Sequence, residues 1–192
     1  MENRKHILLH SCCGPCSTAC IERLLPDYDV TVLYANSNIT DPEEYEKRKL
    51  NQLTVIQRTN EKIKKGFFPE ASLVNFLEGE YDPDLFYELV KGFEQEPEGG
   101  ARCPICFRMR LKEAAKMAAI IGIPYFTTTL PVSPHKNFEQ IAEIGREEGE
   151  AHGAEFVPFD FKKRDGFKRS IELSKEFDLY RQNYCGCSFS KR

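Results

Sequence analysis

The stretch Ile-Leu-Leu-His-Ser-Cys-Cys-Gly-Pro-Cys, residues 7–16, decides how this chain folds. Its apolar first part predicts a short buried strand over residues 5–11, which the turn-forming residues then end. Pro15 suits the first turn of a helix, because its ring fixes a helical φ and its missing N–H would have no helical partner there. We therefore expect a loop rich in thiols, followed by a short helix that ends near Leu25.

The same alternation of strand and helix continues along the chain. Further strands are expected at residues 29–35, 72–77, 125–130 and 155–159, where β-branched and aromatic residues cluster. Helices are expected at residues 42–65, 83–95, 107–121, 137–148 and 167–177, with Asp41 as the N-cap of the first. The expected buried face of helix 42–65 carries Tyr45, Leu50, Leu53 and Ile56. This order predicts an α/β three-layer sandwich with a parallel sheet and right-handed crossovers.

The composition is that of one globular domain. A chain of 192 residues with 41% hydrophobic and 30% charged residues can bury a core of useful size. We expect a single domain over residues 1–192, with a less regular segment around 66–102 and a polar, aromatic tail at 180–192 that carries cysteines. The net charge of −3 argues against a generally cationic nucleic-acid binder but leaves room for a local basic patch.

The cysteine content points to metal or redox chemistry. The first residues lack the apolar region of a signal peptide, and no apolar run approaches the roughly 18 residues that span a bilayer. We therefore expect a soluble cytoplasmic protein that does not associate with membranes. In that reducing compartment, eight cysteines are poor candidates for structural disulfides. Adjacent Cys12 and Cys13, and the close pair Cys185 and Cys187, suit a shared metal better.

Two Cys-x-x-Cys pairs share a local plan. Cys13 and Cys16, like Cys103 and Cys106, lie at the predicted start of a helix with a proline between them. The partial positive charge of a helix N-terminus lowers the pKa of a thiol, and thiolates are what metals bind. In an open parallel sheet these helix ends face the carboxyl ends of the strands, where ligands bind. We therefore expect both pairs to point into one crevice.

The number of thiols helps to distinguish between a zinc site, a redox-active dithiol and an iron–sulfur cluster. Either pair alone could be a dithiol redox pair or half of a zinc site. Both pairs, together with Cys12, Cys185 and Cys187, exceed what one zinc ion binds. A 4Fe–4S cluster takes four thiolates and leaves thiols for a second metal or for substrate chemistry. The alternative is a closed zinc site with spare buried cysteines. Cys20 is expected to be a small buried apolar residue outside the centre.

Other side chains near the expected crevice have more than one possible role. Asp160 follows a predicted strand and could be a metal ligand, a proton donor or a loop cap. His10 and His135 either line the site or make ordinary hydrogen bonds. Basic and aromatic residues near the crevice suit phosphate contacts and base stacking on unpaired RNA, or simply a solvated face. The candidate RNA-binding residues are Lys162, Lys163, Arg164, Arg181 and Tyr184. Motifs for binding ATP or NAD phosphates are absent, which disfavours both nucleotides.

Five stretches taken together resemble one enzyme family. They are LLHSCCGPCS at 8–17, RCPICFRMRL at 102–111, FTTTLPVSPHK at 126–136, DFKKRDG at 160–166 and YRQNYCGCSFS at 180–190. In this order they closely resemble the QueH-type epoxyqueuosine reductases, over Ile7 to Ser190. The one departure is Lys162, where the family's motif has arginine.

The resemblance implies a fold and a reaction. The fold would be like that of the adenine-nucleotide hydrolases (HUP, Rossmann-like), with cysteines in place of the nucleotide loop. The reaction would be the two-electron removal of the epoxide oxygen of epoxyqueuosine at the tRNA wobble position, which gives queuosine. The implied cofactor is a 4Fe–4S cluster without cobalamin, with room for a second mononuclear iron. The implied partners are tRNAs with a GUN anticodon, for Tyr, His, Asn and Asp, and an external electron donor such as ferredoxin or flavodoxin.

The resemblance also assigns residues. The implied catalytic residues are Asp160, Cys12 and Cys16, and the implied metal ligands are Cys12, Cys13, Cys103, Cys106, Cys185 and Cys187. Cys20 matches none of the family's cysteine motifs. Two other functions remain open on the residues alone: a zinc-stabilised RNA-binding module without catalysis, and a metal-free dithiol oxidoreductase.

Overall fold

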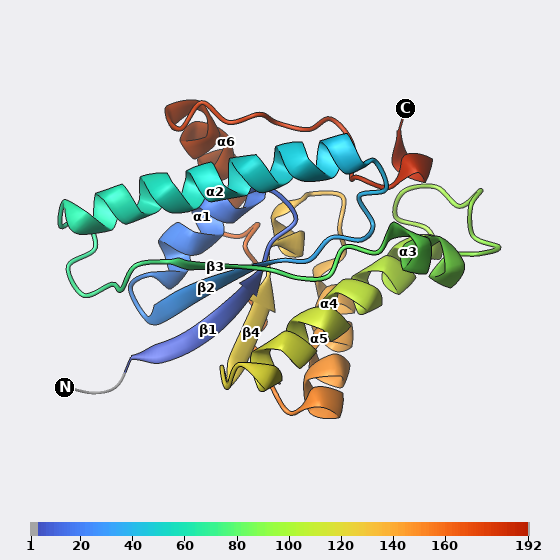
Figure 1. Ribbon diagram of the computed structural model, residues 1–192, viewed down its shortest axis with the longest axis horizontal. Helices are drawn as coiled ribbons and strands as arrows, with labels where there is room; N and C mark the ends of the chain where they lie inside the picture. Colours follow the sequence, from blue (N-terminus) through green and yellow to red (C-terminus); the bar gives the residue numbers. More distant parts are fainter. Residues whose placement is uncertain (1–3, 192) are drawn as a thin grey trace.

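Five parallel strands form the centre of the protein. The computed structural model describes residues 4–191, and its strands lie in the order β3-β2-β1-β4-β5 (Figure 1). Every neighbouring pair is parallel, so the predicted α/β sandwich is confirmed. The strands are β1 (Lys5–His10), β2 (Tyr28–Tyr34), β3 (Asn75–Glu78), β4 (Tyr125–Thr128) and β5 (Glu155–Phe156).

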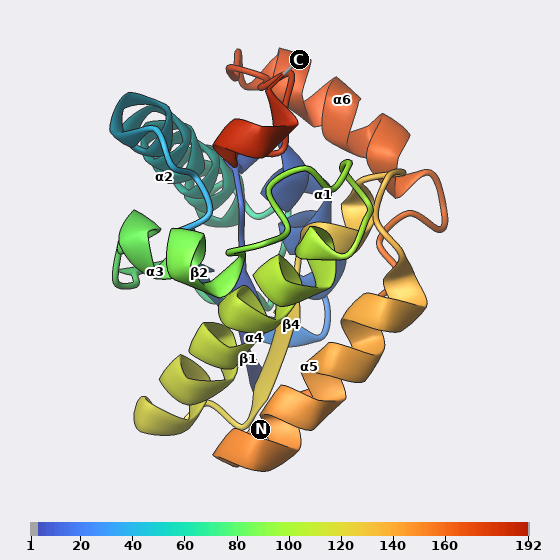
Figure 2. The same cartoon turned by 90° about the vertical axis from the view of Figure 1, so that its right-hand side faces the viewer.

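Helices cover both faces of this sheet. Helices α1 (Gly14–Leu24), α2 (Pro42–Lys64) and α6 (Gly166–Glu176) pack together on one face, and α4 (Arg102–Ile120) and α5 (Phe138–His152) on the other (Figure 2). The short helix α3 (Pro83–Leu89) packs beside α4, and two 3₁₀ turns are η1 (Leu130–Val132) and η2 (Ser188–Ser190). Within the described residues, no helix is both long enough and apolar enough to cross a bilayer.

The central strand β1 is apolar on both sides because both sides are covered. Ile7 and Leu9 face the core beneath α1 and α6. Leu8 faces the opposite core, beneath α4 and α5. All three side chains are fully buried, as expected for a strand in a parallel sheet with helices on both faces.

The chain reverses its direction of travel across the sheet between β1 and β4. From β1 it moves outward through β2 to β3, and after α4 it returns to β4 and continues to β5 on the other side. Ligands of open α/β sheets bind at the carboxyl ends of the strands at such a switch point. Cys12 follows β1 and Thr129 follows β4, and the Cys12 N–H lies 3.4 Å from Thr129 Oγ1. The cysteine loop therefore occupies the switch point.

Several predicted elements have different bounds. The strand expected at 72–77 is Asn75–Glu78, and the helix expected at 137–148 is Phe138–His152. The helix expected at 83–95 ends at Leu89, because carbonyls of the following turns, including that of Phe93, accept hydrogen bonds from Arg102. The helix expected at 107–121 begins earlier, at Arg102, and includes both cysteines of the second pair. The strand expected at 155–159 ends at Phe156, just before Pro158, which has no N–H to donate.

The predicted buried face of α2 is wrong in part. Leu50 and Leu53 are 61% and 39% exposed. The face that turns inward instead carries Arg48 and Gln52, which are 1% and 0% exposed. Helix α2 covers polar groups of the cysteine loop and of the C-terminal tail, so its buried side has to offer hydrogen bonds.

The close approach of α5 to β5 gives a test of the fold. A Cβ added at Gly145 would lie 2.6 Å from ring carbons of Phe156, so Gly145→Ala forces the helix and strand apart. We expect the free energy of unfolding, measured by urea denaturation, to fall by about 1–3 kcal/mol. The control Glu143→Ala lies on the exposed side of the same helix and should change it by less than about 0.5 kcal/mol. Equal effects of the two variants would contradict this packing.

Candidate metal centre

Three thiols meet in the loop after β1. The sulfur atoms of Cys12, Cys13 and Cys16 all lie within 4.8 Å of one another, and those of Cys12 and Cys13 are 3.9 Å apart. Two thiolates on one metal ion, each about 2.3 Å from it, lie at most about 4.6 Å apart. The spacing of these three thiols, the loop triad, is therefore close to what a single ion requires.

The loop triad favours one thiolate held by two thiols. Hydrogen bonds from Cys13 and Cys16 hold the pKa of Cys12 well below its ordinary value, and the positive charges of Arg110 and Lys136 lower it further. The same contact with Cys12 raises the pKa of Cys13 to about 12 and that of Cys16 well above its ordinary value. A metal ion would have to displace those protons.

Four more cysteines come together beside the loop triad. Cys103 and Cys106 lie in the first turn of α4, and the tail brings Cys185 and Cys187 close enough to raise the pKa of both. In the described part of the chain, no three of these four sulfur atoms are as close together as those of the loop triad. A cluster in which each thiolate binds a different iron suits this wider spacing. We call these four residues the helix–tail set.

Burial outweighs the helix N-terminus at Cys103 and Cys106, whereas contact with Cys12 does so at Cys13 and Cys16. The predicted lowering of thiol pKa at the two Cys-x-x-Cys pairs is wrong. Burial raises the pKa of Cys103, and it raises that of Cys106 to about 12 despite the opposing charge of Arg110. A metal supplies the positive charge that would turn such thiols into thiolates. Cys20 is fully buried in the apolar core beneath α1, as predicted.

Two cations link the cysteine groups. Arg110 lies one turn beyond Cys106 on α4 and is 1% exposed. Its Nη2 donates to Asn36 Oδ1 over 2.8 Å. Negative charge on Cys106 and on Cys12 raises its pKa against the effect of burial. Negative charge on Cys185 and on Cys12 likewise raises the pKa of Lys136 against the effect of burial. The structure therefore brings both cysteine groups to one edge of the sheet, as predicted.

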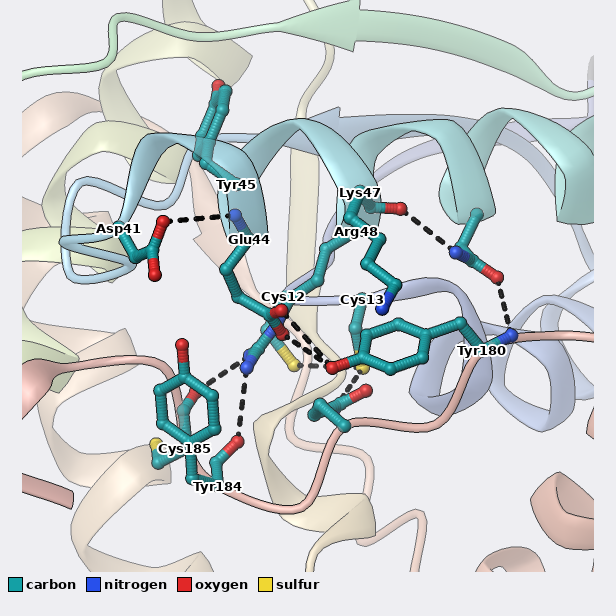
Figure 3. Close-up of polar contacts among 12 residues, drawn as sticks. Cys12, Cys13, Asp41, Glu44, Tyr45, Lys47, Arg48, Tyr180, Tyr184 and Cys185 are labelled. Atoms are coloured by element: carbon teal, nitrogen blue, oxygen red, sulfur yellow. Dashed lines mark hydrogen bonds and ion pairs between the residues drawn. The ribbon is translucent and has the colours of Figure 1, made fainter. Parts of the chain in front are cut away.

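Arg48 of α2 fixes the tail that carries the last two cysteines. Its guanidinium donates to the carbonyls of Cys185 over 2.9 Å and Tyr184 over 3.2 Å (Figure 3). Its Nε donates to Glu44 Oε1 over 2.6 Å, and the Tyr184 ring lies 5.1 Å from the guanidinium carbon. The charge of this buried arginine is therefore paired, and the carbonyls it binds define where Cys185 lies.

Two further features fix the course of the tail, and one of them is a contact with the cysteine loop. Gly186 adopts a φ of +131°, where a side chain would be strained, and an added Cβ would lie 3.0 Å from Ile39. The amide of Gln182 donates to Cys13 Sγ over 2.9 Å. The tail therefore touches both the loop triad and the residues around it.

Asp160 contacts its own loop. Its carboxylate accepts the N–H of Lys162 over 3.2 Å and lies 3.9 Å from Lys163 Nζ. The Lys162 amine donates to the Lys136 carbonyl over 2.7 Å, which ties this basic loop to the loop after β4. Lys163 and Arg164 are exposed.

The remaining predicted residues take different positions. Arg181 donates to Ser174 Oγ of α6 over 3.1 Å, and Tyr184 packs on Arg48, so both hold the tail. His10 is fully buried, and burial followed by the charge of Arg110 lowers its pKa to about 3. His135 lies at the exposed rim of a small cavity of about 60 Å³ that Cys103 and Cys185 of the helix–tail set also line. Sequence reasoning missed Arg48, Arg110 and Lys136; the last two lie inside recognised motifs, which was the available signal.

A larger cavity lies on the other side of Arg110. It has a volume of about 430 Å³ and opens between α3 and α4 near the ends of β2 and β3. Its lining is mostly apolar and contains no cysteine among the described residues. Lining residues include Ala35, Leu85, Leu89, Ile105, Met109 and Arg110.

A comparison with known families decides the assignment. The model of the family described as epoxyqueuosine reductase QueH matches residues 7–192. The chain belongs to this family. The match includes every cysteine of both groups, so the resemblance read from the five motifs is confirmed.

Individual QueH proteins are similar over nearly the whole chain. The protein named epoxyqueuosine reductase QueH from Streptococcus pyogenes serotype M1 is 40% identical over 189 residues, which are 98% of this chain and 71% of the relative. Its namesake from Acinetobacter baylyi is 37% identical over 193 residues, 100% of this chain and 83% of the relative. The one from Thermotoga maritima is 34% identical over 187 residues, 96% and 89% of the two chains.

The contacts of Arg48 predict that its loss frees the tail. In Arg48→Met, the carbonyls of Tyr184 and Cys185 and the Glu44 carboxylate lose their buried partner. We expect the free energy of unfolding to fall by about 3 kcal/mol, and trypsin to cleave faster after Arg181, as followed by mass spectrometry. The control Arg58→Met removes an exposed arginine of the same helix and should change neither. Wild-type cleavage kinetics in Arg48→Met would show that Arg48 does not hold the tail.

Proposed function

We propose that this protein is an epoxyqueuosine reductase that acts on tRNA. The reaction would remove the epoxide oxygen of epoxyqueuosine at the wobble position. Two electrons and two protons convert the epoxide to an alkene and release the oxygen as water, which gives queuosine. Membership of the QueH family supports this reaction. The observation that carries it is the meeting of two cysteine groups at the switch point of the sheet, where an α/β fold binds its reactants.

The donor set fits an iron–sulfur cofactor. All the thiols of the helix–tail set are candidate ligands of a 4Fe–4S cluster, because four thiolates with wider spacing suit four irons. The loop triad, through Cys12 and Cys13, is the candidate site of a second mononuclear iron. When bound, such a cofactor would supply electrons one at a time and a Lewis acid for the oxygen, without cobalamin.

The chain's own residues would supply protons and charge. Cys16 keeps its proton at neutral pH because its pKa is raised, so it is one candidate donor to the departing oxygen. Asp160 is the other, and the exposed basic loop that it caps would have to bring it to the substrate. Cys12, the most acidic thiol of the loop triad, is the candidate ligand or nucleophile beside the reacting carbon.

The RNA would approach over the basic loop at the same edge of the sheet. Lys163 and Arg164 are exposed there, whereas Arg181 and Tyr184 are engaged in holding the tail. A wobble base is unpaired, so no duplex has to be opened before it enters a crevice. The proposed substrates are tRNAs with a GUN anticodon, for Tyr, His, Asn and Asp, and the proposed electron donor is a ferredoxin or flavodoxin.

The reaction can be tested directly. Anaerobically purified protein is incubated with a chemical reductant and tRNA that contains epoxyqueuosine, and the nucleosides are analysed by mass. We expect conversion of epoxyqueuosine to a product lighter by one oxygen atom, identical to queuosine in chromatography. A colourless protein with stoichiometric zinc, no acid-labile sulfide and no conversion would instead favour the zinc-stabilised RNA-binding module.

The helix–tail set predicts a spectroscopic effect. Anaerobic protein with iron and sulfide bound should show a visible charge-transfer band, and Cys103→Ala or Cys106→Ala should bleach it because a cluster ligand is lost. Cys20→Ala is the matched control, since this thiol lies in the apolar core and its loss should leave the band unchanged. An unchanged spectrum in both variants of the pair would remove Cys103 and Cys106 from the ligand set.

The basic loop predicts a change in the salt dependence of tRNA binding. Replacing Lys163 and Arg164 by glutamine should weaken binding and reduce the slope of log affinity against log salt by roughly 0.7 per lost phosphate contact. The control replaces Lys64 and Lys65, exposed at the far end of α2, and removes the same charge. If both double variants bind tRNA alike across salt concentrations, the loop has no special part in binding.

A further inference from the structure

Arg110 is a buried cation without a carboxylate partner. Its side chain is 1% exposed, and in residues 4–191 no carboxylate oxygen lies within 4.0 Å of its guanidinium nitrogens. Its hydrogen-bonding neighbours are neutral: Asn36 Oδ1 at 2.8 Å and His10 Nε2 at 3.4 Å. Burying an unpaired charge costs several kcal/mol, and a negative group beside the guanidinium would offset this cost.

The other fully buried arginines show what is usual in this fold. Arg48 pairs with the Glu44 carboxylate at 2.6 Å. Arg102 donates to carbonyls of the turns before α4, including that of Phe93 at 3.0 Å. Arg48 therefore has a carboxylate partner, and Arg102 donates to three backbone carbonyls. Among the hydrogen bonds of the described residues, Arg110 has neither kind of acceptor and is the exception among these three.

Sulfur atoms are the negative groups available to Arg110. It lies one turn beyond Cys106 on α4, and Asn36 links it to the Ser11 carbonyl, directly before Cys12. After burial, the charges that most affect its pKa are those of Cys106 and then Cys12. These two thiols belong to different cysteine groups, so one guanidinium faces both.

The orientation of this guanidinium is fixed. Asn36 accepts from Arg110 through its side-chain oxygen, and its amide nitrogen donates to the Ser11 carbonyl over 2.8 Å. That carbonyl belongs to the cysteine loop itself, directly before Cys12. The fully buried hydrogen bonds from Arg110 to Asn36 and from Asn36 to Ser11 thus fix the position of the cation relative to the loop triad.

We propose that Arg110 is the charge-compensating residue of the metal centre: it balances the negative charge of the thiolate-bound cofactor on both cysteine groups and raises its reduction potential. This inference rests on the proposed iron–sulfur function. Reduction adds negative charge to a cluster, and a fixed cation in a low-dielectric interior stabilises the reduced state more than the oxidised one. Arg110 acts through the cofactor's charge and not by contact with the substrate.

Two substitutions remove the free charge by different chemistry. Arg110→Met deletes the guanidinium and keeps an unbranched side chain. Asn36→Asp keeps Arg110 but places a carboxylate 2.8 Å from its Nη2, where the amide oxygen lies, so the charge is neutralised in place. The control Arg108→Met removes a cation from the same helix that is 48% exposed and already paired with Glu147 and Glu148.

The measurement is the midpoint potential of anaerobically prepared, iron- and sulfide-loaded protein, from a redox titration followed by electron paramagnetic resonance. We expect both Arg110→Met and Asn36→Asp to shift the potential negative by at least the equivalent of a tenfold change in the equilibrium constant, about 59 mV for a one-electron couple. Arg108→Met should keep the wild-type potential. Iron and sulfide contents, measured on the same samples, show how much cofactor each variant holds.

The outcomes separate this inference from the proposed function. Unshifted potentials in both variants, with a cluster present, would overturn the role of Arg110 and leave the reductase intact. Loss of the folded metal-free protein in both variants, seen by circular dichroism, would also overturn it, because the arginine would then serve the fold alone. Folded variants that no longer retain iron would support compensation. Wild-type protein that binds no cluster would reject the proposed function and this inference with it.

Discussion

The ends of β1 and β4 lie side by side at one edge of a parallel sheet, and the whole candidate metal centre depends on this placement. The chain travels outward from β1 to β3 before it returns to β4, so the loops after these two strands meet at the switch point. Cys12 and Thr129 mark the two loops. Helix α4 and the C-terminal tail then bring the helix–tail set to the same edge. Segments far apart in sequence thus come together within an ordinary α/β fold.

Buried positive charge completes this arrangement. Most of the thiols have a raised pKa: contact with Cys12 raises that of Cys13, and burial raises that of Cys106. Arg110, held by Asn36 and facing both cysteine groups, offers the charge that thiolates need. Arg48 performs a different task with the same side chain, because it is paired with Glu44 and positions the backbone of Cys185. The two arginines account for why a helix surface that faces the interior can be polar in this protein.

The sequence predicted the sheet, the helices around it and the convergence of the cysteines, because apolar strands and helix-start prolines are local signals. It misplaced Leu50 and Leu53, since the pattern of α2 resembles that of a surface helix with an apolar stripe, and the residues that are in fact buried, Arg48 and Gln52, look like solvent-facing ones. Arg48 binds carbonyls of the distant C-terminal tail, and Gln52 accepts a hydrogen bond from Ser11 of the cysteine loop. The thiol pKa values were misjudged because desolvation depends on packing that no local motif encodes. Motif resemblance identified the family, yet it did not distinguish the two cysteine groups.

The central claim is that two separate cysteine groups hold iron at the switch point of the sheet. Anomalous diffraction from anaerobically grown crystals, recorded on both sides of the iron absorption edge, tests it most directly. The prediction is strong iron-edge density enclosed by Cys103, Cys106, Cys185 and Cys187, with a separate iron peak beside Cys12 and Cys13. A peak at the zinc edge alone, or iron density that the tail cysteines do not contact, would contradict it.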